Sequence, residues 1–186
     1  MLLESHPLMG QHIVSTKPTS LAIQPIADCA RYNLRIAPEN LARAAEAFGS
    51  GLPDKIGTTV ASGENLALCL GPDEWQLYAP LAASNAIEAA FTGLYTSCPH
   101  SLVDTSHREI GISVEGTAAV LALRSACAFD FNTMAPGTGV RTIFDKAQIV
   151  LIRLGDDRFR IEVWRSFATH VWGLLEAASH EISLGI

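Results

Sequence analysis

Few side chains of this sequence combine types and spacing that could do chemistry. Ser106 and His107 place a hydroxyl beside an imidazole, the pairing that a small hydrolase would need. Because adjacent residues of a strand point to opposite faces, their adjacency argues against contact. Gly137-Thr138-Gly139 lacks the third glycine of a dinucleotide-binding motif and is expected to open no helix, so it predicts a loop. We therefore predict a chain without catalytic residues or a cofactor of its own.

Metal and redox chemistry are not expected either. His100 and His107 could share a metal ion only with ligands that the sequence does not identify, so no metal site is predicted. The cysteines lie far apart and form no Cys-x-x-Cys pair, which disfavours zinc binding and disulfide exchange; they are Cys29, Cys69, Cys98 and Cys127. Free thiols of this kind are typical of buried residues in a reducing compartment, so we expect a cytoplasmic protein.

Surface contact is the remaining kind of function, and two segments suggest it. The polar run Asp104–Arg108 precedes an apolar strand, and it either binds a ligand or partner or forms an Asp–Arg tether within the chain. Residues 135–142 are expected to form a rigid exposed loop just after two phenylalanines, which either fit a protein–protein contact or fold back onto the core. The candidate partner interface comprises Trp75, His107, Arg108, Phe129, Phe131, Arg141 and Arg165.

The composition supports a folded chain that acts through other proteins. Its 186 residues are 48% hydrophobic and 17% charged, which is enough for a packed core. A net charge of −6 with scattered Lys and Arg disfavours binding to nucleic acid. No apolar run approaches the ~20 residues that span a bilayer. The start, MLLESHPLMGQ, lacks the basic lead-in of a signal peptide, so none is predicted, and no membrane partner is expected.

Hydrophobic periodicity indicates the elements that must position these residues. Residues 1–30 are broken by prolines and are predicted to form an irregular N-terminal arm. A strand–helix–strand–strand–helix order follows, with strands at 32–36, 66–70 and 75–79 and helices at 38–48 and 87–94. A short strand is expected near 101–105. The same order then recurs, with strands at 110–114, 149–154 and 159–163 and helices at 117–124 and 167–178.

An internal repeat gives the fold class. The segment LGPDEWQLYAP from Leu70 aligns with LGDDRFRIEVW from Leu154, 84 positions further along the chain. We predict an α+β protein, an internally duplicated strand–helix–strand–strand–helix unit made of two ferredoxin-like halves. The duplicated domain covers residues 31–186, its halves run from about 31 to 95 and from 108 to 182, and residues 96–107 join them.

Five segments, in order and at plausible spacing, resemble the gamma subunit of heterotetrameric sarcosine oxidase. They are GPDEW (71–75), DTSHR (104–108), CAFDF (127–131), APGTGVRTIFDKAQIVLIR (135–153) and FRIEVWRSFATHVWGLLEAA (159–178). Each segment alone is weak, but together they are specific. The resemblance covers most of the chain after residue 30, and the N-terminal arm adds little to it.

The resemblance implies a function for the chain within a complex of alpha, beta, gamma and delta subunits. Such a complex oxidatively demethylates sarcosine to glycine, with formation of hydrogen peroxide and of formaldehyde or methylene-tetrahydrofolate. Flavins and NAD belong to the alpha and beta subunits and zinc to delta, which leaves gamma as a non-catalytic partner without a cofactor.

The implied fold is similar to the folate-binding domain of the aminomethyltransferase family. The sequence shows no acidic residue in a recognisable folate motif and no cysteine loop of the related iron–sulfur repair proteins, so folate binding is not expected. The alternative is a stand-alone folate- or aminomethyl-binding protein, which would need a deep polar pocket between the two halves.

Overall fold

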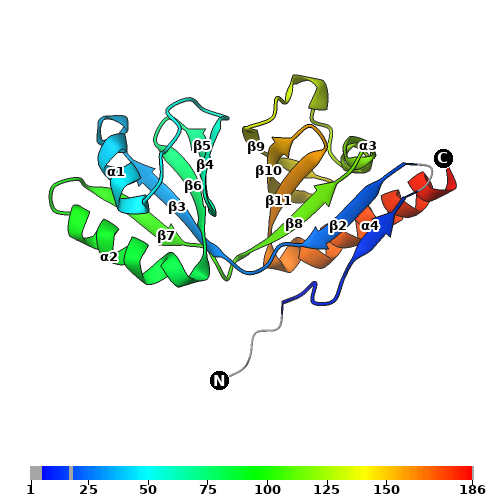
Figure 1. Cartoon of the computed structure of the whole chain (residues 1–186), viewed down its shortest axis with the longest axis horizontal. Coiled ribbons are helices and arrows are strands. Elements are labelled where there is room, and N and C mark those ends of the chain that lie inside the picture. The colour runs from blue at the N-terminus through cyan, green and yellow to red at the C-terminus, as the bar shows by residue number, and fades with distance from the viewer. Residues whose placement is uncertain (1–5, 17–18, 186) are drawn as a thin grey trace. The chain divides into compact units, whose positions relative to one another are not determined.

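The computed structural model describes residues 6–16 and 19–185, and Figure 1 shows their elements. The chain divides into two compact units. Unit 1 comprises the described parts of Met1–Ala27, Arg108–Pro136 and Arg141–Ile186, and unit 2 comprises Asp28–His107 and Gly137–Val140. Unit 2 is therefore inserted into the sequence of unit 1. No helix among the described residues is long and apolar enough to cross a bilayer.

Unit 2 holds a five-stranded antiparallel sheet in the order β4-β5-β6-β3-β7. Its strands are β3 (Ala30–Ile36), β4 (Thr59–Ser62), β5 (Asn65–Gly71), β6 (Glu74–Ala79) and β7 (His100–Asp104). Its helices are α1 (Leu41–Phe48) and α2 (Ser84–Leu94), each preceded by a 3-10 turn, Pro38–Asn40 and Leu81–Ala83. The strand, helix and hairpin predictions for this part of the chain are confirmed.

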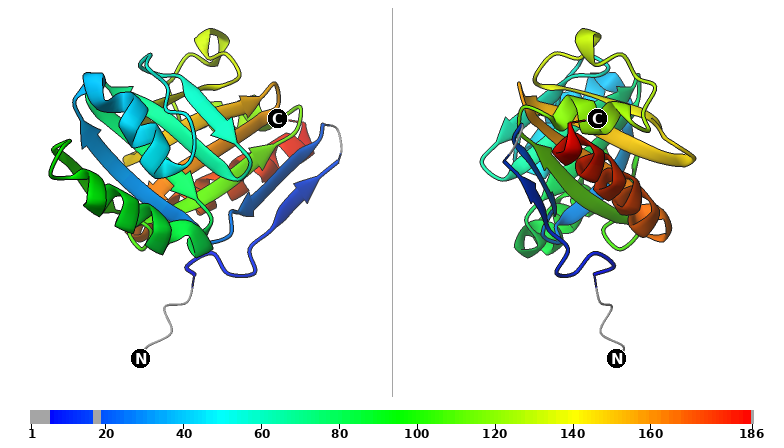
Figure 2. Two further views of the ribbon diagram at one scale, coloured as in Figure 1. Left: turned by 60° about the vertical axis from the view of Figure 1, so that its left-hand side comes forward. Right: turned by 90° about the vertical axis from the view of Figure 1, so that its right-hand side faces the viewer.

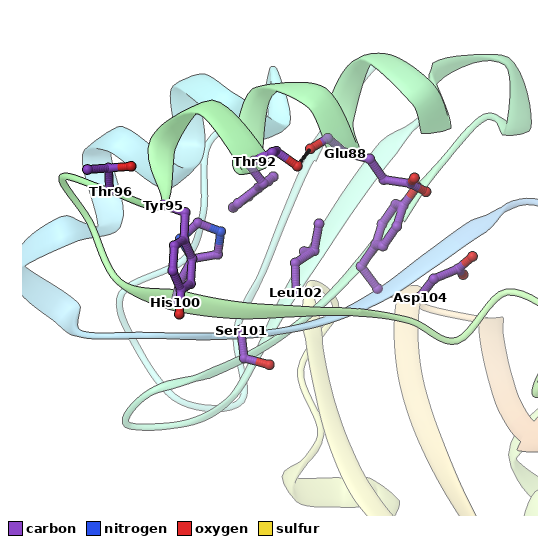
Figure 3. A pocket seen from close by; sticks show the side chains of 10 residues that line it. Glu88, Thr92, Tyr95, Thr96, His100, Ser101, Leu102 and Asp104 are labelled. Carbon is purple, nitrogen blue, oxygen red and sulfur yellow. Dashed lines mark hydrogen bonds between the residues drawn. The ribbon is translucent and has the colours of Figure 1, made fainter.

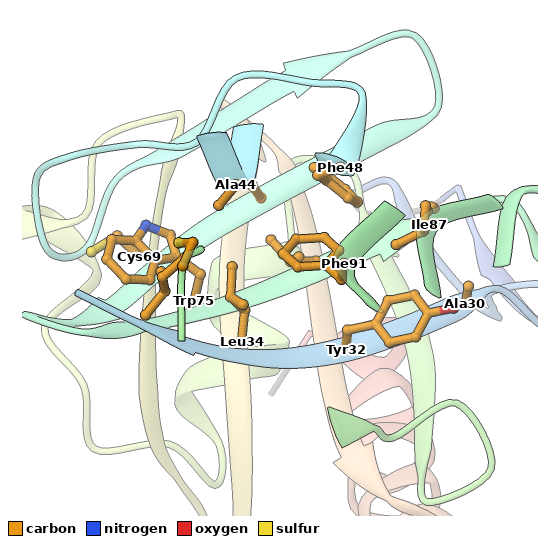
Figure 4. Packing of buried hydrophobic residues seen from close by; sticks show 14 residues of the cluster. Ala30, Tyr32, Leu34, Ala44, Phe48, Cys69, Trp75, Ile87 and Phe91 are labelled. Carbon is orange, nitrogen blue, oxygen red and sulfur yellow. The ribbon is translucent and has the colours of Figure 1, made fainter. Parts of the chain in front are cut away.

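Alternating apolar residues place the core of unit 2 on one face of this sheet. Tyr32 and Leu34 of β3 pack with Trp75 of β6 and with Phe48 and Phe91 of the two helices (Figure 4). Helix α1 ends at Gly49, which adopts φ +75° and donates its N–H to the carbonyl of Ala45, a left-handed cap that glycine adopts without strain. Together, α1 and α2 cover this face of the sheet with their apolar side chains.

Unit 1 is built on a six-stranded sheet in the order β1-β2-β8-β11-β10-β9. Its strands are β1 (Ile13–Ser15), β2 (Leu21–Pro25), β8 (Glu109–Glu115), β9 (Thr138–Phe144), β10 (Ala147–Gly155) and β11 (Arg158–Trp164). The first three residues of β9 are grouped with unit 2. Its helices are α3 (Ala119–Arg124) and α4 (Ala168–Leu184), with 3-10 turns at Phe131–Thr133 and Arg165–Phe167. Helix α4 packs against the sheet, where it contacts β11 and β1 (Figure 2).

The two sheets correspond strand by strand. The order β4-β5-β6-β3-β7 of unit 2 matches β9-β10-β11-β8-β2 of unit 1. The register of β5 with β6 shifts before Gly71, and the register of β10 with β11 shifts before Gly155, at the spacing of the sequence repeat. The predicted α+β class is confirmed, because the chain combines helices with two antiparallel sheets.

Two predictions about irregular segments were wrong. The N-terminal arm contains β1 and β2, and Leu21 and Ile23 of β2 are buried beside β8, because their alternation was obscured by the neighbouring prolines. Pro25 stands at the last position of β2, where a missing N–H is tolerated. Residues 1–5 and 17–18 of the predicted arm lie outside the described residues. The loop predicted over 135–142 is half strand, since β9 begins at Thr138.

Candidate partner-binding surface

Two of the predicted interface residues meet at one end of the sheet of unit 1. Strand β8 begins where β11 ends, and Glu109 lies opposite Trp164 in their register. The N–H of Arg165 donates to the carbonyl of Arg108 at 2.7 Å and fixes the two chain segments together. The guanidinium of Arg108 lies 5.6 Å from the ring centroid of Trp164, and its Nη2 donates to Oε1 of Glu109 at 3.0 Å. We name these four residues the Arg108–Trp164 patch.

The Arg108–Trp164 patch combines a broad apolar ring with a fixed cation. Trp164 is 44% exposed, because the buried residues of β11 that alternate with it, such as Val163, face the core. An exposed pairing of Arg and Trp contributes only about 0.5–1 kcal/mol to the stability of a chain by itself. Trp and Arg are enriched among the residues that dominate binding energy at protein interfaces. The patch therefore presents residue types that are enriched at protein interfaces, which makes it the candidate contact surface of unit 1.

Arg108 and Arg165 were predicted as interface residues, whereas Trp164 was not. Its signal was available, since Phe159, Ile161 and Val163 alternate as the buried face and leave Trp164 on the other face. His107 is exposed but belongs to unit 2, and Arg141 is exposed on β9 rather than on a loop.

Trp75 does not lie at a surface, so its assignment to the interface is wrong. Its side chain is 2% exposed within the core of unit 2, and its Nε1–H donates to the carbonyl of Pro53 at 2.7 Å. The indole thus satisfies its one donor inside the unit and anchors the segment between α1 and β4.

Phe131 is likewise wrong as a contact residue, because the segment that carries it folds onto unit 1. Its ring is 2% exposed and meets Phe159 edge-to-face at 5.9 Å. The guanidinium of Arg153 lies 5.4 Å from the Phe159 ring and donates to the carbonyl of Met134, which closes the segment over the sheet. Phe129 stays half-buried, edge-to-face with Phe131 at 5.9 Å.

The polar run Asp104–Arg108 is organised by hydrogen bonds inside unit 2 rather than by an Asp–Arg tether. Oδ1 of Asp104 accepts from the N–H of Ser106 at 2.8 Å, and Oγ of Ser106 accepts from the N–H of Arg31 at 2.9 Å. The salt bridge that Arg108 makes is with Glu109. Oγ of Ser106 thus helps to hold the polar run beside the start of β3.

A groove of about 760 Å³ runs between helix α2 and strand β7 of unit 2 (Figure 3). At one end, the ring of His100 meets Tyr95 and Phe91 edge-to-face, with centroids 5.5 and 5.2 Å away. At the other end, Glu88 of α2 and Asp104 of β7 place two carboxyl groups. We name this feature the α2–β7 groove.

Tyr32 links the floor of the α2–β7 groove to its acidic end. The hydroxyl of Tyr32 donates to Oε1 of Glu88 at 3.0 Å. Burial raises the pKa of the Tyr32 phenol, and the nearby Glu88 and Asp104 carboxylates raise it further. The phenol stays protonated at physiological pH and serves as a donor that orients Glu88.

Metal-binding clusters do not occur in the part of the chain that the structure describes. Within residues 6–16 and 19–185, no group of three or more His, Cys, Asp or Glu side chains is placed to hold an ion. Cys69, Cys98 and Cys127 are buried free thiols, Cys29 is half-buried, and burial raises the pKa of the Cys69 thiol.

The sequence of this chain is similar to that of known proteins over most of its length. The model of the sarcosine oxidase, gamma subunit family matches residues 35–181. Sarcosine oxidase subunit gamma of Corynebacterium sp. (strain P-1) is 31% identical over 166 residues, which cover 86% of this chain and 81% of the relative. The subunit gamma of an Arthrobacter sp. is 30% identical over 149 residues, which cover 76% and 71%.

Solved structures agree on the fold. A chain of heterotetrameric sarcosine oxidase from Corynebacterium sp. U-96 matches with a TM-score of 0.78 and 27% identity, over 88% of this chain and 86% of that chain. The glycine cleavage aminomethyltransferase of Bartonella henselae shares the fold, with a TM-score of 0.65 at 16% identity over 82% of this chain and 44% of that chain. This chain belongs to the sarcosine oxidase gamma subunit family.

Proposed function

We propose that this chain is the non-catalytic gamma subunit of a heterotetrameric sarcosine oxidase. The single observation that supports the proposal most is the match along 86% of a chain taken from such a complex, at a TM-score of 0.78. The complex oxidatively demethylates sarcosine to glycine, with hydrogen peroxide and formaldehyde or methylene-tetrahydrofolate as further products. The partners are the alpha, beta and delta subunits, which carry the flavins, NAD and zinc, and the assembly works in the cytoplasm.

In this proposal the Arg108–Trp164 patch is a docking surface for the larger subunits. The patch presents an aromatic ring and two arginines, the residue types that carry most binding energy when they become buried at an interface. Arg141, Phe129 and His107 are further contact residues in the proposal, and Arg141 and His107 are exposed in the structure. Their role is packing and charge pairing rather than proton or hydride transfer.

Co-expression with the alpha, beta and delta subunits, followed by size exclusion, tests the proposal. We expect the chain to co-elute with a yellow flavoprotein. Trp164→Ala should weaken this association by tenfold or more, because truncation of a hot-spot tryptophan at an interface costs about 2 kcal/mol or more. Leu154→Ala is the matched control, since Leu154 is 40% exposed on β10 of the same unit. A colourless chain that elutes alone would refute the proposal.

The alternative function, a stand-alone folate- or aminomethyl-binding protein, draws on the fold that the chain shares with the aminomethyltransferase. Calorimetric titration with a tetrahydrofolate derivative separates the two proposals. The subunit proposal expects no heat of binding from the isolated chain. Tight binding together with failure to co-elute with a flavoprotein would favour the alternative.

We further propose that units 1 and 2 descend from one duplicated, ferredoxin-like half. The matched strand orders support this origin, as do the register shifts at Gly71 and Gly155. The halves differ from the boundaries given by the repeat alone, because unit 1 also recruits the N-terminal strands. In this proposal the duplication covers four strands and the two helices of each unit. The strand beside them differs in origin, since it is β7 in unit 2 and the N-terminal β2 in unit 1.

A further inference from the structure

The two sheets differ beyond their corresponding strands β2 and β7. In unit 1 the position beyond β2 is filled by strand β1. Strand β2 pairs with β8 as β7 pairs with β3. In unit 1 the sheet then continues, because β1 pairs antiparallel with β2 from Ile13 opposite Ile23 to Ser15 opposite Leu21. In unit 2 the sheet ends at β7. The chain itself thus shows that an extended segment fits beside the edge strand of this architecture.

The occupied position in unit 1 lies between the edge strand and a helix. Strand β1 contacts α4 as well as pairing with β2. The corresponding helix of unit 2 is α2, and the corresponding space is the α2–β7 groove. The groove is therefore the unit 2 counterpart of the place that β1 fills in unit 1.

Backbone groups along the groove are placed to bind a strand. The N–H of Thr105 donates to the carbonyl of Arg31, so the residues of β7 that alternate with Thr105 direct their hydrogen bonds toward β3. The N–H and C=O of Leu102 and Asp104 consequently point to the outer edge. Among residues 6–16 and 19–185, no strand pairs with that edge. Such a row of backbone groups is a template for an added strand.

Side chains of the groove define what the added strand must carry. His100 and Tyr95 form an aromatic end, where Tyr95 is 58% exposed. Glu88 and Asp104 form an acidic end, and each carboxylate is engaged through one oxygen, by Tyr32 and by the Ser106 N–H. His100 and Asp104 lie four residues apart on one face of β7, about 13 Å at the usual rise of a strand.

We propose that the α2–β7 groove binds an extended segment of another subunit of the oxidase as a sixth strand beside β7. That segment carries an apolar or aromatic side chain against Tyr95 and His100, and a Lys or Arg four residues away against Glu88 and Asp104. Backbone pairing supplies affinity, and the two ends of the groove select the segment and its direction. This inference rests on the proposed function, since it names the contact that a partner subunit makes.

Hydrogen–deuterium exchange on the co-purified complex and on the free chain tests the inference. We expect peptides that span residues 100–104 to exchange at least about tenfold more slowly in the complex, because the outward amides of Leu102 and Asp104 become paired. Unchanged exchange in a complex that does form would overturn the inference and leave the proposed function intact. Protection that appears in the concentrated free chain would also overturn it, because a second copy would then be the occupant.

Charge reversal gives an independent arm of the test. Glu88→Lys should weaken assembly by about tenfold, since it opposes the basic residue of the added segment. Glu46→Lys makes the same charge change on the exposed side of α1 and should leave assembly unchanged. Equal assembly of both variants with the parent chain would count against the inference. Absence of any complex, even with the unaltered chain, would refute the proposed function and this inference together.

Discussion

Units 1 and 2 use the same strand order but close their sheets differently. In unit 1 the outer position beyond β2 is filled by β1, a segment of the chain's own N-terminal region. In unit 2 the sheet stops at β7, beside a groove with an aromatic and an acidic end. The comparison shows that one architecture can be extended by a segment of its own chain, and in unit 2 we propose that a partner supplies the corresponding segment. Substitutions at corresponding positions of the two units test whether the edge filled by β1 and the edge at β7 differ in stability as this comparison predicts.

The largest effect is expected where β2 is held close to β8. Gly116 adopts φ +115°, and a Cβ there would lie 2.3 Å from the carbonyl oxygen of Ser20. Gly116→Ala should therefore lower the free energy of unfolding by about 3–5 kcal/mol, through backbone strain and a clash with main-chain atoms. Chemical denaturation followed by circular dichroism measures this change.

Gly63→Ala in unit 2 is the control for Gly116→Ala. Gly63 also has a positive φ, +59°, but nothing lies within 4 Å of its added Cβ. We expect a loss of only about 1 kcal/mol, from backbone strain alone. Equal losses for the two glycines would contradict the close approach of Ser20 to Gly116.

A smaller effect should distinguish the strands that flank the two sheets. Ile23 of β2 is fully buried, and Ile23→Ala should cost about 2–4 kcal/mol, because it leaves a cavity on the buried face of the sheet. Leu102 of β7 is half-buried at the groove, and Leu102→Ala should cost about 1 kcal/mol in the free chain. Thermal unfolding of both variants measures which substitution costs more stability. If Leu102→Ala cost more than Ile23→Ala, the Leu102 side chain would be more fully buried in the free chain than an open groove allows.

The smallest effect concerns the turns that join β4 to β5 and β9 to β10. Unit 2 uses Gly63 at φ +59°, whereas unit 1 uses Asp145 at φ +53°, with its Oδ2 2.7 Å from Nε2 of His170. The hydrogen bond from His170 lowers the pKa of the Asp145 carboxyl. Asp145→Asn keeps a residue that tolerates this backbone and removes the charge, so it should cost less stability than Leu102→Ala.

The pH dependence of that loss follows from the direction of the pKa shift. A carboxyl whose pKa is lowered in the folded state stabilises the fold above its unfolded pKa, about 3.9, and this contribution is lost as the pH falls through the lowered value. The difference in melting temperature between the parent chain and Asp145→Asn should therefore be full near neutral pH and shrink in strong acid. A difference that stays constant on acidification would assign the effect to the turn rather than to the charge.

Sequence patterns predicted the regular parts of this fold because one face of each strand or helix is buried. The alternation of Ile110, Ile112 and Val114 placed β8, and the helix spacing of Val171 and Leu175 placed α4. Strand β6 was placed too, but its Gln76 and Tyr78 are buried as well as its Trp75. Trp75 lies on the same face of β6 as Leu77, in the core of unit 2, so the alternation itself indicated burial and the assignment of Trp75 to the interface went against it.

Irregular segments were harder, because tertiary pairing rather than local pattern holds them. Strand β2 ends in a proline, and β9 begins beside two glycines, so both were predicted to lack structure. The Arg108–Trp164 patch was half predicted, since Arg108 and Arg165 are distant in sequence and meet only through the pairing of β8 with β11. The α2–β7 groove was not predicted, because no single segment contains both of its walls.

The insertion of unit 2 into the sequence of unit 1 also orders events during synthesis. Strand β2 leaves the ribosome before any of unit 2, and its partner β8 follows only after all of β3 to β7. At roughly 5–20 residues per second, this separation leaves β2 without its partner for on the order of 10 seconds. The five strands β3 to β7 and both helices of unit 2 can fold in that interval, because they all precede β8 in the chain, whereas unit 1 must wait for β8 and α4. The translation rate across unit 2 therefore sets how long a hydrophobic strand stays available to chaperones and to neighbouring chains.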